Sequence, residues 1–276
     1  MAKMARHRSE LGKVKRLRES LGSVHGSPRP ASDTALASAS DLPSGKQTKV
    51  RGLDSKVLRA NRIVAPFPGD QNSDVFRMLR TQVLQRMKQR NARTLGICSA
   101  RESEGKSLVA LNLAISISQI EGQSVLLVEL DLRRPSLLKT LELSVDKGID
   151  DVLAEEATIA DCLINPGYEG LVILPTRKPR LFSSEIMSSP KMASLATELR
   201  DRYPDRFVIY DLPPMLFGDD CLAVTSRLDA CLFVVEEGKT RTSELQRALS
   251  LIDKDILIGT VLNKASKGSQ RYYGYY

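Results

Sequence analysis

Short apolar runs alternate with longer amphipathic stretches along residues 94–264. The apolar runs have the length of strands and carry few polar side chains. We expect strands at 94–98, 125–130, 171–175, 207–212, 230–238 and 256–264. Strands that are apolar on both faces are buried on both faces. The pattern therefore predicts a mostly parallel sheet with helices on each side.

Helical periodicity fills the segments between these runs. Val75, Leu79, Val83 and Met87, for example, recur at the i, i+4 spacing of one helix face. We expect helices at 73–90, 106–119, 190–203 and 243–253. Strands that alternate with helices indicate an α/β domain of the doubly wound type.

Composition divides the chain into three parts. Residues 1–60 begin with a basic stretch and continue as a Ser-, Pro-, Gly- and Ala-rich stretch, which predicts a disordered tail and linker. We expect order to begin near Ile63, a folded domain over 61–268 and a tyrosine-rich tail over 269–276. The basic stretch also has apolar residues at near-helical spacing. An amphipathic helix that contacts an anionic membrane or a partner is the alternative to a solvated tail.

The net charge of +8 is confined to one end of the chain. Residues 1–60 carry 13 basic and 5 acidic side chains, whereas the rest carries 28 of each. A neutral folded domain argues against specific nucleic-acid binding. No apolar run approaches the roughly 18 residues of a membrane span, and no secretory signal is recognisable. We therefore expect a cytoplasmic protein.

Scarce histidine and dispersed cysteine exclude several kinds of catalytic site. Both histidines, His7 and His25, precede the expected domain, so a Ser-His-Asp triad or a His-bound metal is excluded from it. The four cysteines form no C-x-x-C pair, which indicates reduced thiols rather than zinc ligands. Acid–base chemistry in the domain must then use carboxylates, lysine or tyrosine.

The segment LGICSARESEGKSL has the form of a phosphate-binding loop, or P-loop. Gly105, Lys106 and Ser107 follow a strand and open a helix, where backbone amides and the helix N-terminus can face phosphates. In such a loop Lys106 would reach the outer phosphates and Ser107 would bind Mg²⁺. Ala100 stands where the standard pattern has its first glycine.

Acidic residues end two other expected strands. In VLLVELDLRRPSL, Glu129 and Asp131 are two residues apart, which places both on one face, and Arg133 follows them. In FVIYDLPPML, Asp211 ends an apolar strand, as a Walker B aspartate does when it helps to hold Mg²⁺. Carboxyl ends of parallel strands are where ligands bind in such sheets.

Polar or aromatic residues also mark the last strand and the end of the chain. Asn263 ends the expected strand 256–264, where it would either contact an adenine edge or cap a turn. Four of the seven tyrosines lie in the last five positions: Tyr272, Tyr273, Tyr275 and Tyr276. Either the tail docks on a partner or it is itself modified.

The set SARESEGKS, VELDLRRPSL, YDLPPML and the tyrosine tail resembles the bacterial tyrosine kinases, over roughly residues 63–276. These are P-loop autokinases of capsule and exopolysaccharide export, here in the stand-alone cytoplasmic form. The resemblance implies the fold of the septum-site and partition ATPases. It also implies ATP and Mg²⁺ as ligands and transfer of the γ-phosphate to tail tyrosines of a neighbouring subunit.

Carried over by position, the resemblance implies roles for individual residues. Glu129 replaces the first aspartate of the family's D-x-D-x-R motif, and Asp74 replaces the glutamate of its oligomer helix. The implied catalytic residues are Lys106, Asp131, Glu129 and Asp211, with Asp131 or Glu129 as the base. The implied nucleotide-binding residues are Ser103, Glu104, Gly105, Lys106, Ser107, Leu108 and Asn263. Ser107, Asp131 and Asp211 would hold the metal, Arg77 and Arg80 would contact another subunit, and the four tail tyrosines would accept phosphate.

The resemblance also implies partners and leaves other function classes open. It implies a membrane-embedded polysaccharide chain-length regulator or co-polymerase as activator, a homo-oligomer, and a location at the inner face of the plasma membrane. The same fold serves partition-type switch ATPases without kinase activity, which carry a lysine where Arg101 stands. A scaffold with a degenerate nucleotide site is the third reading, on the strength of Glu129.

Overall fold

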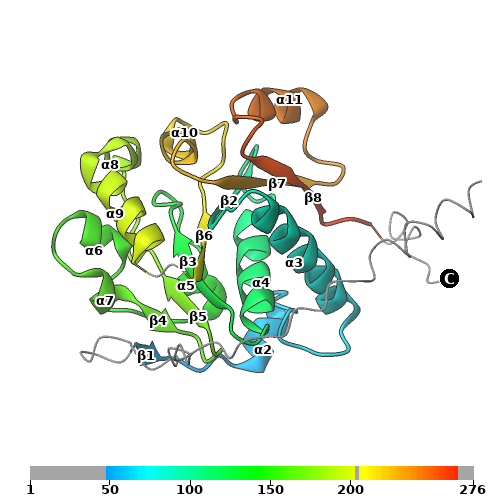
Figure 1. Ribbon diagram of the computed structural model, residues 1–276, viewed down its shortest axis with the longest axis horizontal. Coiled ribbons are helices and arrows are strands. Elements are labelled where there is room, and N and C mark those ends of the chain that lie inside the picture. Colours follow the sequence, from blue (N-terminus) through cyan, green and yellow to red (C-terminus); the bar gives the residue numbers. More distant parts are fainter. Residues whose placement is uncertain (1–47, 203–204, 267–276) are drawn as a thin grey trace, which may run out of the picture. The chain divides into compact units, whose positions relative to one another are not determined.

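The computed structural model describes residues 48–202 and 205–266, and in that part of the chain eight strands form one sheet (Figure 1). The strands are β1 (Lys49–Val50), β2 (Thr94–Ser99), β3 (Ser124–Glu129), β4 (Ile164–Asn165), β5 (Leu171–Leu174), β6 (Arg206–Asp211), β7 (Ala230–Glu236) and β8 (Leu257–Asn263). Their order is β1-β4-β5-β3-β6-β2-β7-β8, and every neighbouring pair is parallel except β4 with β5. The six expected strands and the mostly parallel sheet are confirmed. The sequence did not predict β1 or β4, since two residues carry no periodic signal.

Helices connect the strands within the described residues. They are α2 (Ser55–Ala60), α3 (Gln71–Gln89), α4 (Lys106–Ser118), α5 (Leu137–Leu141), α6 (Ile149–Leu153), α7 (Ile159–Cys162), α8 (Ser183–Ser188), α9 (Pro190–Asp201), α10 (Asp220–Thr225) and α11 (Thr242–Ser250). The four expected helices correspond to α3, α4, α9 and α11. The structure describes β1 and α2 before Ile63, where we expected order to begin, and Leu58 of α2 is buried in the core. None of the helices in the described ranges is both long and apolar enough to cross a membrane.

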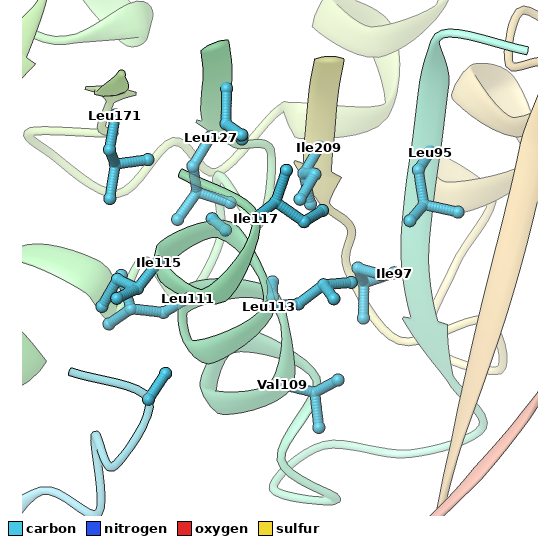
Figure 2. Packing of buried hydrophobic residues seen from close by; sticks show 14 of the residues in the cluster. Leu95, Ile97, Val109, Leu111, Leu113, Ile115, Ile117, Leu127, Leu171 and Ile209 are labelled. Carbon is cyan, nitrogen blue, oxygen red and sulfur yellow. The ribbon is translucent and has the colours of Figure 1, made fainter. Parts of the chain in front are cut away.

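Two apolar clusters cover the two faces of the sheet. Alternate residues of β3 divide between them: Leu127 belongs to the cluster with α2, α3, α4 and α5, whereas Leu126 belongs to the cluster with α6 to α11. Figure 2 shows α4 in the first cluster, with apolar side chains such as Leu113 facing Ile97 and Ile209 on the strands. Both faces of the central strands are therefore buried, as the doubly wound fold requires.

The parallel order brings distant residues to one edge of the sheet. Strand β6 lies between β3 and β2, and Asp211 at its end pairs in register with Glu129 and Ile97. The P-loop follows β2, and Asp131 lies two residues beyond β3. Asn263 ends β8, which pairs in parallel with β7. The carboxyl ends of these strands thus collect the predicted site residues.

Candidate active site

The P-loop connects β2 to α4 and turns through the left-handed region twice. Ser103 has φ 61° and Gly105 has φ 93°. A Cβ atom at Gly105 would lie 2.0 Å from Nδ2 of Asn263, so both the backbone conformation and the space require glycine there. Ala100 is not among the described residues with positive φ, and its carbonyl accepts a hydrogen bond from the Leu216 amide at 3.2 Å. Alanine therefore fits where the standard pattern has glycine.

Glu104 fixes the shape of the loop. Its buried carboxylate accepts hydrogen bonds from the Arg101 amide at 2.8 Å and from the Thr240 hydroxyl. The sequence predicts that Glu104 contacts the nucleotide, but its side chain is hydrogen-bonded to Arg101 and Thr240 of the protein itself. Only its backbone amide remains for a ligand.

Lys106 and Asp131 form a buried ion pair at the centre of the site. Nζ of Lys106 donates to Oδ2 of Asp131 at 2.8 Å, and Oδ1 of Asp131 accepts from the Arg134 amide at 3.1 Å. Burial favours the neutral amine, but the carboxylates of Asp211, Asp131 and Glu129 outweigh it and raise the pKa of Lys106. The lysine is thus cationic.

Asp211 is a fully buried carboxylate with open acceptor sites. Neither of its oxygens has a hydrogen-bond partner among the described residues, although the Ser107 hydroxyl lies nearby. Burial raises the pKa of Asp211 to about 6, against the opposing effects of Lys106 and Ser107. A buried acceptor without a partner is costly to folding, which points to a ligand at this position.

The Glu129 carboxylate makes its hydrogen bonds to backbone amides and not to Lys106. Its carboxylate accepts hydrogen bonds from the amides of Ser136 at 2.5 Å, Leu137 at 2.8 Å and Thr176 at 3.0 Å. Burial and the charge of Asp211 raise its pKa to about 7, while the three amides oppose that shift. With its lone pairs engaged in this way, Glu129 anchors the start of α5 and the end of β5. The alternative of Glu129 as catalytic base is therefore not supported by the geometry.

Arg133 ties the loop after β3 to two helices. Its guanidinium binds Asp220 through two hydrogen bonds, from Nε at 3.0 Å and from Nη2 at 3.1 Å, and also contacts the hydroxyls of Ser183 and Ser184. Asp220 is buried at the start of α10. The sequence did not indicate Asp220, because nothing in the Asp219-Asp220 pair at the start of a short helix distinguishes the buried member.

Two other residues expected at the nucleotide site occupy different environments. Asn263 donates from Nδ2 to the Glu104 carbonyl at 2.9 Å. In this structure it therefore holds the P-loop, which was neither of the expected roles. The Leu108 side chain packs against the apolar cluster around α4. The tail tyrosines Tyr272, Tyr273, Tyr275 and Tyr276 lie outside the described residues.

The expected subunit-contact residues lie on α3. Arg77 pairs with Asp74 one turn earlier, and Arg80 donates from Nη1 to the Ser116 carbonyl of α4 at 2.8 Å. Burial, with a smaller effect of Arg77, lowers the pKa of Arg80. Val75 and Met78 on the same helix are exposed. Both arginines are half-buried, but Nε of Arg80 is fully buried whereas 38% of the Arg77 side chain is exposed.

A cavity of about 230 Å³ adjoins the outer side of the P-loop. Arg101, Glu102, Ser103, Glu104, Phe217 and Lys239 line it. A larger cavity of about 350 Å³ lies near Arg93 and Phe207, at the amino ends of β2 and β6. Lys106, Asp131 and Asp211 lie at the carboxyl ends of the strands. We associate the candidate site with the smaller cavity, because P-loop residues line it, although Lys106, Asp131 and Asp211 are not among its lining residues.

Comparison with known proteins shows which proteins the chain resembles in sequence and fold. No protein-family model matches the chain. Tyrosine-protein kinase YwqD of Bacillus subtilis is 29% identical over 221 residues, which cover 79% of this chain and 92% of YwqD. The kinase domain of Escherichia coli tyrosine kinase ETK superposes with a TM-score of 0.69 at 25% identity, covering 83% of this chain and 93% of that domain. The chain is a homologue of the bacterial tyrosine kinases.

Two further similarities bear on fold and setting. Succinoglycan biosynthesis transport protein ExoP of Rhizobium meliloti is 30% identical over 212 residues, or 75% of this chain, but these cover only 26% of ExoP. The septum site-determining protein MinD of Pyrococcus horikoshii, solved with Mg-ADP, has a TM-score of 0.51 at 20% identity. It covers 63% of this chain and shares the fold alone. The expected fold, that of the septum-site ATPases, is thereby confirmed.

Proposed function

We propose that this protein is an ATP-dependent protein-tyrosine kinase that phosphorylates its own C-terminal tyrosines, each copy acting on the tail of another. The observation that carries the proposal is the grouping of Lys106, Asp131 and Asp211 beside the P-loop. The homology to tyrosine kinases supports the reaction class. Tyr272, Tyr273, Tyr275 and Tyr276 are the proposed acceptors.

The residues present fit a nucleotide with magnesium. Within the described chain, the amides of Glu104 and Gly105 donate no hydrogen bond, and both oxygens of Asp211 are open. No group of three or more His, Cys, Asp or Glu that could hold a metal is present in that part of the chain. Mg²⁺ usually takes only one or two carboxylates and completes its shell with phosphates and water. Ser107 and Asp211, with Asp131 adjacent, would hold it, and it would neutralise charge on the transferred phosphoryl group.

Side chains of the protein would then bind the outer phosphates and accept the proton of the tyrosine. Lys106, now paired with Asp131 at 2.8 Å, is the cation available to the outer phosphates. When Lys106 turns toward phosphate, Asp131 loses its partner and becomes free to accept a proton. A phenol with a pKa of about 10 needs such a base, and histidine is absent from residues 61–276. We assign the base to Asp131.

We place the enzyme in capsule or exopolysaccharide production, regulating polymerisation and export. The similarity to ExoP, a succinoglycan biosynthesis transport protein, supports this setting. The proposed activator is a membrane-embedded chain-length regulator or co-polymerase, which would hold a cytoplasmic kinase at the inner face of the plasma membrane. The basic N-terminal residues would add contact with anionic lipid. Arg77, flanked by exposed Val75 and Met78, is the proposed centre of a subunit contact, with Arg80 beside it.

Mass spectrometry of the purified protein after incubation with Mg·ATP tests the proposal. We expect phosphate on the tail tyrosines of the wild type. Lys106→Ala should carry none, because the phosphates lose their cation, and a chain ending at Gly268 should carry none because it lacks acceptors. Hydrolysis of ATP without any phosphotyrosine in the wild type would instead support a partition-type switch ATPase. In that case Arg101, which is exposed and paired with Glu244, would be the residue to examine.

A further inference from the structure

Two residues at the end of β8 donate hydrogen bonds to backbone carbonyls of the P-loop. Nζ of Lys264 donates to the Ser103 carbonyl at 2.6 Å, and Nδ2 of Asn263 donates to the Glu104 carbonyl at 2.9 Å. These residues are some 160 positions apart in the sequence. They meet because β8 and the P-loop lie at the same edge of the sheet.

These two hydrogen bonds determine where the next two amides point. In a trans peptide the carbonyl of one residue and the N–H of the following residue lie on opposite sides. No described peptide bond is cis. With the carbonyls of Ser103 and Glu104 held toward β8, the amides of Glu104 and Gly105 point away from β8. Neither amide donates a hydrogen bond to another described residue.

Lys264 is itself held in place. It lies in the left-handed region at φ 55°, which is uncommon for a residue with a side chain. Its ammonium group also donates to Oε2 of Glu236 at 3.0 Å, at the end of β7. Asn263 is packed so closely that any Cβ atom at Gly105 would overlap its amide. Several contacts therefore fix the positions of the Lys264 and Asn263 side chains against the P-loop.

We propose that Lys264 and Asn263 are positioning residues, which aim the amides of Glu104 and Gly105 at the phosphates of a bound nucleotide. The inference rests on the proposed nucleotide site and adds a role to residues at the far end of the chain. Neither side chain needs to touch the nucleotide. Successive unpaired amides that point to the same side can form an anion-binding site, and P-loop amides bind the inner phosphates that ADP and ATP share.

Nucleotide binding to Lys264→Met tests this, measured by titration calorimetry with ADP and with ATP in the presence of Mg²⁺. We expect about tenfold weaker binding of both nucleotides, the size of one lost charge-assisted hydrogen bond. Lys264→Arg should restore most of the affinity, because a guanidinium can donate to the same carbonyl. Lys147→Met is the matched control. Lys147 also donates to a backbone carbonyl, that of Glu156 at 3.3 Å, but this bond joins the two segments that flank α6 and does not involve the P-loop, so the nucleotide affinity of Lys147→Met should be unchanged.

A second readout needs no nucleotide. Hydrogen exchange of P-loop peptides in the free protein should become faster in Lys264→Met and in Asn263→Ala, and not in Lys147→Met. Wild-type affinity for both nucleotides in Lys264→Met would overturn the inference while leaving the proposed function intact. Weaker binding of ATP alone would also overturn it, because that result indicates direct contact with the γ-phosphate. A wild-type protein that binds neither nucleotide would instead refute the proposed function.

Discussion

Asp211→Asn is expected to stabilise the nucleotide-free protein while abolishing phosphoryl transfer. The pKa of Asp211 is about 6 in the folded protein, compared with about 3.8 when exposed. A shift of about two units corresponds to about 3 kcal/mol by which the ionised form opposes folding. The amide of asparagine carries no charge, so the variant should recover up to that amount at pH 8.

The sign of this effect fixes its pH dependence. Because the folded state holds the proton more tightly than the unfolded state, wild-type stability should fall as the pH rises from about 4 to about 6. Glu129, with its pKa raised to about 7, acts in the same direction. Asp211→Asn should remove the Asp211 part of the slope. It should also lose the stabilisation that Mg·ADP gives the wild type, because the open carboxylate that would help to hold the metal is gone.

Chemical denaturation between pH 4 and pH 8, with and without Mg·ADP, measures both effects. Tail phosphorylation should fall at least 100-fold in the same variant. If Asp211→Asn were less stable than the wild type at pH 8, the Asp211 carboxylate would stabilise the fold by itself, which would contradict its role as a metal ligand that opposes folding when no metal is bound.

Asp131→Asn is expected to lose tyrosine phosphorylation by about 10²- to 10⁴-fold, the usual contribution of a general base. ATP binding should be retained or become tighter. In the free wild type Lys106 is bound to Asp131 at 2.8 Å, and the nucleotide must compete for it. Asparagine holds the lysine only through a neutral hydrogen bond, so the phosphates compete with a weaker partner.

Calorimetric ATP binding and peptide mass spectrometry of the tail, performed on the same preparation, check this expectation. Asp161→Asn serves as the control, since Asp161 is an acidic residue at the N-terminal turn of α7, away from the P-loop. Full tail phosphorylation in Asp131→Asn would refute the assignment of the base. Loss of ATP binding together with transfer would show that Asp131 acts chiefly in binding.

The sequence was most informative where an element is long and where its chemistry is local. The strands buried on both faces and the four longer helices follow directly from runs and periods of apolar residues. The P-loop could be located because glycine, lysine and serine must be adjacent to form it. Strand β4 and the helices of four to six residues could not be found, because such short segments complete no periodic pattern.

Side-chain direction was the part of the site that the sequence could not supply. Glu129 and Asp131 share a strand face by spacing, yet Glu129 reaches three backbone amides and Asp131 reaches Lys106. The extra methylene of glutamate allows that reach. The partners come from segments up to 47 residues away in sequence, which only the folded chain brings together. Asp220 and Lys264 are further examples, because their roles depend on contacts between elements.

Transfer between copies is the central claim, and a mixing experiment tests it most directly. Lys106→Ala with its complete tail supplies acceptors without activity, and the chain ending at Gly268 supplies activity without acceptors. After incubation with Mg·ATP, we predict phosphate on Tyr272–Tyr276 of Lys106→Ala in the mixture and none when either protein is incubated alone. Phosphotyrosine in the wild type without any in the mixture would contradict transfer between copies, and ATP hydrolysis without phosphotyrosine in either would contradict the kinase itself.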